Sequence, residues 1–141
     1  MAPQEDLSRF TEAHARDYAQ ALGEIRTGRK RSHWMWYIFP QIEGLGRSLM
    51  SREYAIRDLA EARAFLADPV LGAHLEEISR ALLAQEERDP HRIFGSPDDM
   101  KLCSCMTLFA AAAGGDSVYQ QVLDAFFPGG PDRKTLAILG L

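Results

Sequence analysis

Apolar residues recur at the three- and four-residue spacing of an α-helix along most of the chain. The first such stretch places one apolar face along a single helix, formed by Leu7, Phe10, Tyr18, Ala21, Leu22 and Ile25. Glycine and proline separate the periodic stretches and predict helices over residues 7–27, 32–38, 58–67, 69–85, 97–113, 116–126 and 132–139. No alternating segment is flanked by hairpin turns, so we expect an all-α fold without strands.

Two of these helices carry a start signal in which a capping side chain precedes a proline. Asp68-Pro69 and Ser96-Pro97 each combine a side-chain acceptor with a proline suited to the first helical position. Asp99 follows three residues after Ser96, as in an acidic variant of the capping box. We therefore expect Asp68 and Ser96 to cap the helices that follow them.

The segment 97–113 is apolar nearly all round, which predicts a central, buried helix. Lys101 nevertheless points into its apolar sector, with Ser104 one turn on and Thr107 one turn further. Lysine is almost never fully buried without a partner. Its stem could reach solvent, it could pair with an acid such as Asp98, or its ammonium group could point into a ligand-binding cleft. These alternatives stay open on the sequence alone.

The densest chemistry lies in residues 26–41, where basic residues precede a group of aromatic ones. The basic residues before His33 are Arg26, Arg29, Lys30 and Arg31. The aromatic residues after it are Trp34, Trp36, Tyr37 and Phe39, followed by Pro40 and Gln41. Aromatic rings beside cations could stack on a base or a similar ring and hold a phosphate. Alternatively, the rings anchor the core and the cations surround a solvated helix end.

Like Lys101, His14 is a polar residue on an apolar helix face: it lies in the middle of the apolar face of the first predicted helix. It is either a core histidine with its hydrogen bonds satisfied or a site residue. The candidate ligand-binding residues are therefore His14, His33, Trp34, Trp36, Gln41, Lys101 and Ser104.

Metal, cofactor and nucleophile signals are poor. The histidines lack zinc-binding spacing, and we expect no metal and no cofactor. Cys103 and Cys105 are two residues apart and point away from each other on a helix, so we expect reduced, structural thiols. The sequence Gly44-Leu-Gly-Arg-Ser48 is a weak match to an anion-binding loop and is better interpreted as a turn.

Composition and length narrow the class of protein but do not indicate an activity. The 141 residues suffice for one domain; we expect residues 1–6 to be a flexible N-terminus and residues 7–141 a single all-helical domain. The net charge of −4 argues against a protein held mainly by nucleic-acid phosphates or anionic lipid. No stretch approaches 18 apolar residues and the first six residues do not resemble a signal peptide, so we expect a cytoplasmic location.

Several blocks together resemble one known family. They are His33-Trp-Met-Trp36-x-x-Phe39-Pro-Gln41 with Gly44-Leu-Gly46, then Ile93-Phe-Gly95-x-x-Asp98-x-x-Lys101-Leu-x-Ser104-x-Met-Thr-Leu-Phe109, and Gly130-x-Asp132-x-x-Thr135-Leu136. The sequence resembles domain-of-unknown-function family eighteen-ten, small bacterial proteins sometimes labelled calpastatin. The resemblance implies a single all-helical domain and no particular activity. Where the family is expected to have glutamine, this chain has His14, which can also donate and accept hydrogen bonds.

Three functions from different classes follow from these residues. The first is a helical pocket, catalytic or not, for a small aromatic or phosphate-bearing metabolite. The second is an adaptor that holds a partner protein with exposed Trp36 and Tyr37. The third, weakened by the net acidity, is RNA or DNA binding through residues 26–31 and the aromatic residues that follow. The sequence does not predict the oligomeric state.

Overall fold

The computed structural model describes residues 6–141, which form nine helices and no strand. The helices are α1 (Ser8–Arg26), α2 (Met35–Ile38), α3 (Leu49–Glu53), α4 (Leu59–Ala67), α5 (Leu71–Leu83), α6 (Pro90–Phe94), α7 (Asp98–Ala113), α8 (Val118–Phe126) and α9 (Arg133–Leu139). The expected all-α fold is confirmed. The expected flexible N-terminus lies outside the described residues, apart from Asp6.

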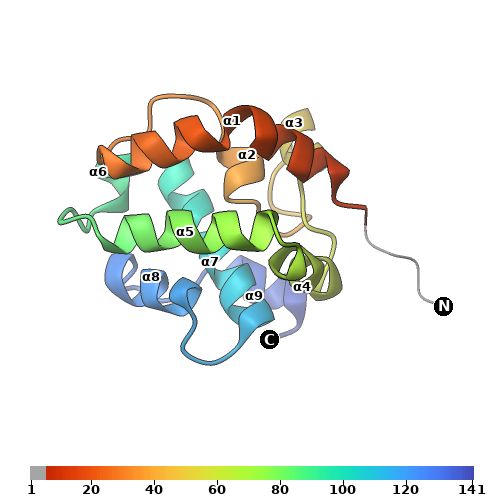
Figure 1. Cartoon of the computed structure of the whole chain (residues 1–141). Helices are drawn as coiled ribbons and strands as arrows, with labels where there is room; N and C mark the ends of the chain where they lie inside the picture. Colours follow the sequence, from red (N-terminus) through yellow and green to blue (C-terminus); the bar gives the residue numbers. More distant parts are fainter. Residues whose placement is uncertain (1–5) are drawn as a thin grey trace.

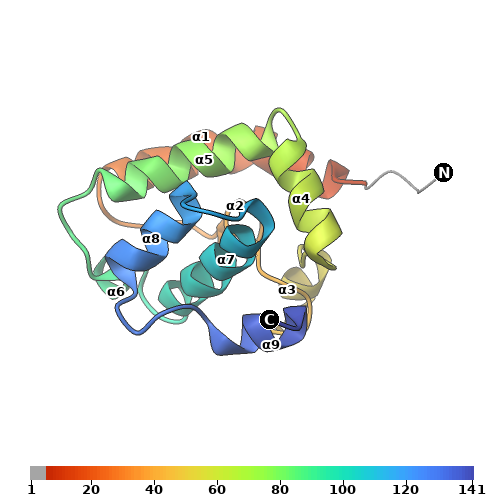
Figure 2. The ribbon, with the colours of Figure 1, turned by 90° about the horizontal axis from the view of Figure 1, so that it is seen from below.

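Helix α7 occupies the centre of the fold, as its apolar sequence predicts. The views in Figures 1 and 2 show it surrounded by the other helices, and it packs directly against α4, α6, α8 and α9. Residues 104–109 of α7 are all buried. Because this one helix packs against four others, its apolar surface supplies much of the core.

A line of aromatic rings crosses the core from α1 through α4 to α7. The centroid of the Phe65 ring lies 5.2 Å from that of Phe10 and 5.2 Å from that of Phe109. Each such pair contributes about 0.5–1.5 kcal/mol beyond the burial of its area. Helix α5 lies along α1 on one side and along α8 on the other (Figures 1 and 2).

The close crossing of α4 and α5 depends on Gly72. A Cβ atom at this position would stand 2.1 Å from the carbonyl oxygen of Leu66, a distance that backbone atoms cannot relieve by a small shift. Glycine therefore lets the first turn of α5 pack directly onto the end of α4.

The structure departs from the predicted helices at three places. Helices α3 and α6 were not predicted, because five residues are too few to show a helical period. The helix predicted over 32–38 contains only residues 35–38.

A parallel bridge between Ile42 and Ile56 holds the loop after α2 against the segment before α4. The turn interpretation of residues 44–48 is confirmed, and Ser48 caps α3 by accepting from the amide of Ser51.

One of the two predicted caps is confirmed and the other is wrong. Asp68 Oδ1 accepts from the amides of Val70 and Leu71, both at 2.9 Å, at the start of α5. Ser96 caps no amide, because the amide of Asp99 donates instead to the carbonyl of Gly95. The residue at the start of α7 is Pro97, and the Ser96 hydroxyl lies against the side chains of His91 and Asp99.

Candidate functional site

Two lysines meet at one carboxylate where α7 begins. Asp98 Oδ2 lies 2.9 Å from Lys30 Nζ, and Asp98 Oδ1 lies 3.8 Å from Lys101 Nζ. Each lysine also stands over a tryptophan: Lys30 Nζ is 5.1 Å from the ring centroid of Trp34, and Lys101 Nζ is 5.8 Å from that of Trp36. We call these five residues the lysine–tryptophan cluster. It brings both tryptophans of the chain to two of its three lysines.

Lys30 is the structural member of this cluster. Its ammonium group donates to the carbonyl of Ser32 at 2.5 Å in addition to the ion pair with Asp98, and its side chain is only 8% exposed. A nearly buried ammonium group with a carboxylate, a carbonyl and an indole face around it has its hydrogen-bonding needs met.

Lys101 has a different environment in the same cluster. Its side chain is 24% exposed, and its nearest acidic oxygen, at 3.8 Å on Asp98, is beyond hydrogen-bond distance. Within residues 6–141 no acceptor forms a hydrogen bond with its ammonium group. Lys101 therefore lies near Asp98, as one of the predicted alternatives had it, and its partly exposed ammonium group keeps N–H groups available to another molecule.

Glu24 fixes the turn that carries His33 and Trp34. Its carboxylate accepts from the amides of Arg31 and Ser32, from the Ser32 hydroxyl and from Trp34 Nε1, at 2.6–3.0 Å. Burial opposes the charge of Glu24, but these hydrogen bonds outweigh it and lower its pKa to about 2. The same contacts explain why the helix predicted from residue 32 does not begin until Met35.

Glu24 was not among the predicted site residues, although the sequence contains a signal for it. A carboxylate near the C-terminal end of a helix is unfavourable beside the carbonyl end of the helix dipole. Glu24 stands two residues before the end of α1, so it needs donors from outside the helix. The loop that follows supplies them.

The other predicted residues of the aromatic segment lie in different environments. His33 is exposed, three residues before Trp36, which is half-buried. Trp34 is buried at 1% exposure, so its ring is part of the core while its edge donates to Glu24. Gln41 is half-buried, and its backbone carbonyl accepts from the amide of Ile56 at 2.9 Å.

Ser104 is buried one turn after Lys101. Its hydroxyl donates to the carbonyl of Met100 within the same helix at 3.2 Å. Thr107 similarly donates to the carbonyl of Cys103 and also accepts from the amide of Asp132 before α9. The hydroxyls of Ser104 and Thr107 thus form their hydrogen bonds within the protein.

His14 has both ring nitrogens bonded, as expected for a core histidine. Its Nε2 donates to the carbonyl of Tyr37 at 2.8 Å, and its Nδ1 lies 3.0 Å from Nδ1 of His74. The His74 ring in turn stacks on Tyr18 with centroids 3.6 Å apart. Burial, with the nearby His74, lowers the pKa of His14 to about 4 despite the bond to Tyr37, so the ring is neutral at pH 7.

Both cysteines are free thiols, as predicted. Cys105 is buried, and burial holds its pKa well above the ordinary value. Cys103 is half-buried, and burial together with the charge of Asp132 raises its pKa to about 11. Neither thiol is a reactive thiolate near pH 7. Over residues 6–141, no group of histidine, cysteine, aspartate and glutamate side chains has the arrangement of a metal site.

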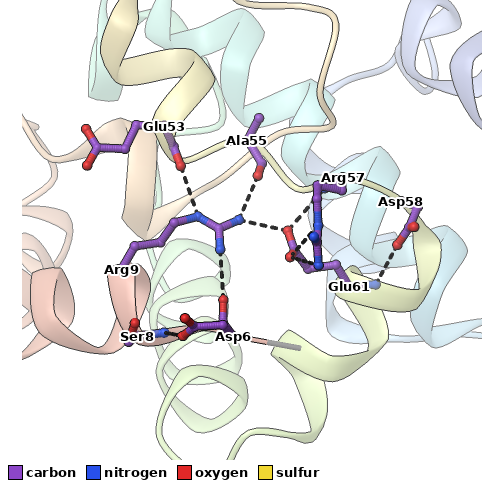
Figure 3. Close-up of polar contacts among 8 residues, drawn as sticks. All are labelled: Asp6, Ser8, Arg9, Glu53, Ala55, Arg57, Asp58 and Glu61. Atoms are coloured by element: carbon purple, nitrogen blue, oxygen red, sulfur yellow. Dashed lines mark hydrogen bonds and ion pairs between the residues drawn. The ribbon is translucent and has the colours of Figure 1, made fainter. Parts of the chain in front are cut away.

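A buried ion cluster that sequence analysis missed joins the start of α1 to the segment before α4 (Figure 3). Glu61 is fully buried, and its carboxylate contacts Arg9 Nη2 at 2.8 Å and Arg57 Nε at 3.1 Å. Arg9 also donates to the backbone carbonyls of Glu53 and Ala55, both at 2.9 Å. With its donors directed at protein acceptors, this cluster holds the fold together rather than presenting charge to a ligand.

These features describe a single all-helical domain with a charged, aromatic cluster at the start of its central helix. The chain belongs to the family described as protein of unknown function (DUF1810), whose model matches residues 4–139, as the sequence blocks predicted.

A solved structure agrees with this membership. The crystal structure of the conserved hypothetical protein Rv1873 from Mycobacterium tuberculosis is similar, with a TM-score of 0.93 and 44% identity over 96% of this chain and 97% of that one. No curated protein matches the chain. Between residues 6 and 141, none of the helices combines the length and apolar character that crossing a membrane requires.

Proposed function

We propose that this is a cytoplasmic bacterial protein that binds a small anionic metabolite at the lysine–tryptophan cluster. Lys101 would supply the charge and Trp36 a ring surface, and His33, exposed three residues before Trp36, would be a further polar group. The observation that carries the proposal is the half-buried ammonium group of Lys101, held over an indole ring with no hydrogen bond to the described residues.

The charge balance of the cluster favours an anion. Two lysines share one carboxylate, and Lys30 holds Asp98 at 2.9 Å while Lys101 lies 3.8 Å away. One positive charge is therefore not compensated within the cluster. A phosphate or carboxylate on the ligand would provide the missing acceptor, and a ring on the same ligand could contact the accessible part of Trp36.

The burial pattern disfavours the adaptor function. That hypothesis required Trp36 and Tyr37 to be exposed, but Tyr37 is 2% exposed and its hydroxyl donates to Asp17. The expected exposure of Tyr37 is wrong, because the short helix α2, which contains Tyr37, packs against α1. Nucleic-acid binding is also less favoured, because Lys30 in the basic run is already paired with Asp98.

A thermal-shift screen with nucleotides, nicotinamide derivatives and sugar phosphates tests the proposal. A ligand at 100 times its dissociation constant stabilises a protein by about 2.7 kcal/mol, which is readily measured. Lys101→Met should remove the shift, because methionine keeps the length of the side chain without its charge. Lys134→Met is the matched control, since Lys134 is exposed on α9.

Three outcomes separate the alternatives. A compound that stabilises the wild type and Lys134→Met but not Lys101→Met supports the site. A compound that stabilises all three proteins equally contradicts the role of Lys101. Absence of any shift across the panel contradicts the small-molecule proposal and favours a partner protein.

A further inference from the structure

A hollow separate from the lysine–tryptophan cluster lies between helices α5 and α8. It has a volume of about 610 Å³ and is bounded by the turn from α4 to α5, the outer face of α5 and the loop from α7 into α8. Both views show α5 and α8 side by side (Figures 1 and 2). Sites for small molecules have volumes of about 300–1,000 Å³, so a small ligand would fit. We call this hollow the α5–α8 groove.

Tyr119 lines this groove and has a hydroxyl without a hydrogen-bond partner among residues 6–141. Its side chain is only 6% exposed, and its ring packs on Phe109 with centroids 6.0 Å apart. The side chain is mostly buried, but its oxygen is still reached by solvent, so it is free to accept from a bound molecule. Phenylalanine would fill the same space without this polar group.

Carboxylates dominate the rim of the groove. Asp68, Glu76 and Asp116 line it together with a single cation, Arg80. Arg80 is already directed at Glu76, with 3.4 Å between Nη2 and Oε1. Three carboxylates against one guanidinium leave a local charge of −2.

The two helix starts beside the groove do not offset this acidity. The first amides of α5 donate to Asp68, and the Gln120 amide of α8 donates to the Ser117 hydroxyl. Their N-termini are thus occupied by the chain's own caps, and an anion would find few donors there. A ligand with N–H donors and positive charge matches the groove better.

We propose that the α5–α8 groove binds a small aliphatic amine that carries two or more ammonium groups. One ammonium group would donate to Tyr119 Oη, and others would lie against the rim carboxylates. The methylene chain between them would contact the apolar wall formed by Leu66, Ala73 and Val118. This site is independent of Lys101 and of the function proposed for the lysine–tryptophan cluster.

The protonation state of Tyr119 agrees with this role. Burial and the nearby charge of Glu76 raise its pKa well above the ordinary value, although Arg80 opposes them. The phenol stays neutral at pH 7, so its oxygen can accept from an ammonium group without itself adding charge.

Titration calorimetry with spermidine at low ionic strength tests the proposal on the full chain. Tyr119→Phe removes only the unpaired hydroxyl, so it should leave the melting temperature equal or higher while weakening spermidine binding about tenfold. Asp116→Asn changes an exposed rim residue and should weaken binding severalfold without loss of fold. Glu12→Gln, an exposed acid on α1 outside the groove, is the matched control and should bind like the wild type.

Specific results would overturn the proposal. Absence of binding by the wild type at low ionic strength excludes the site. Equal affinity of the wild type, Tyr119→Phe and Asp116→Asn shows that spermidine binds elsewhere, and a loss in Glu12→Gln as large as in Asp116→Asn shows a nonspecific charge effect. Lys101→Met should bind spermidine as the wild type does, so failure of the function proposed for the lysine–tryptophan cluster leaves this test unaffected.

Discussion

Nδ1 of His14 and Nδ1 of His74 lie 3.0 Å apart across the contact between α1 and α5, and one proton serves both atoms. The carbonyl of Tyr37 can only accept, so His14 carries its proton on Nε2 and leaves Nδ1 as an acceptor. His74 must then donate from its own Nδ1. A second proton on this pair would place two N–H groups against each other inside the fold.

Protonation of His14 should therefore destabilise the protein in mild acid. The unfolded chain takes up this proton near pH 6.5, whereas the folded protein resists it until about pH 4. The free energy of unfolding is therefore undiminished at pH 7. It falls as the pH drops from about 6.5 to about 4, by about 3 kcal/mol in total. Urea unfolding between pH 7 and pH 4.5 measures the loss.

His14→Gln is the matched variant for this pH effect. Glutamine can donate to the carbonyl of Tyr37 and accept from His74, but it does not titrate. The free energy of unfolding should fall less steeply with acid in His14→Gln than in the wild type. Parallel pH curves for the two proteins would show that carboxylates, and not this histidine pair, set the acid sensitivity.

The two lysines on Asp98 should differ in their effect on stability. Lys30→Met removes a nearly buried charge that is bonded to Asp98 and to the carbonyl of Ser32, so it should cost about 2–4 kcal/mol. Lys101→Met removes a more exposed charge without a hydrogen bond and should change stability by less than about 1 kcal/mol. Denaturant titrations of both variants test this difference. Equal losses would make Lys101 a structural residue and remove the basis of the proposed anion site.

Glu61 should be indispensable for stability. Glu61→Gln keeps the size of the side chain but leaves Arg9 and Arg57 without their shared counter-charge (Figure 3). Because the carboxylate is fully buried while the arginines are partly solvated, we expect a loss of about 2–4 kcal/mol in unfolding free energy. Glu53→Gln should have little effect, since Glu53 is exposed and contributes its backbone carbonyl to Arg9. Similar stability of the two variants would contradict this role.

Ser79→Ala should stabilise the protein. The Ser79 hydroxyl is fully buried on α5 and has no hydrogen-bond partner among residues 6–141. Its removal should raise the free energy of unfolding by about 1 kcal/mol. Thr107→Val provides the contrast, because the Thr107 hydroxyl bonds both Cys103 and Asp132, and its loss should lower the melting temperature. A lower melting temperature for Ser79→Ala would show that its hydroxyl has a partner in solution.

The sequence identified some members of the lysine–tryptophan cluster but not the contacts that join them. Trp34, Trp36 and Lys101 were chosen because polar and aromatic groups stood in apolar segments, and they do lie in one cluster. Their partner Asp98 was expected only as one alternative for Lys101. The place of Lys30 beside Trp34 was not predicted, because its contacts depend on how the loop after α1 turns back around Glu24.

Hydrophobic periodicity by itself determined the helical class of this protein and the burial of α7. A helix that is apolar on all sides can remove its whole surface from water only at the centre of a fold. Only the tertiary structure decided which polar groups meet. The partners of His14 and Arg9 stand 60 and 52 residues further along the chain, at His74 and Glu61. Local spacing contains no information about such contacts, since they arise when helices pack, and packing depends on the shape of the whole core.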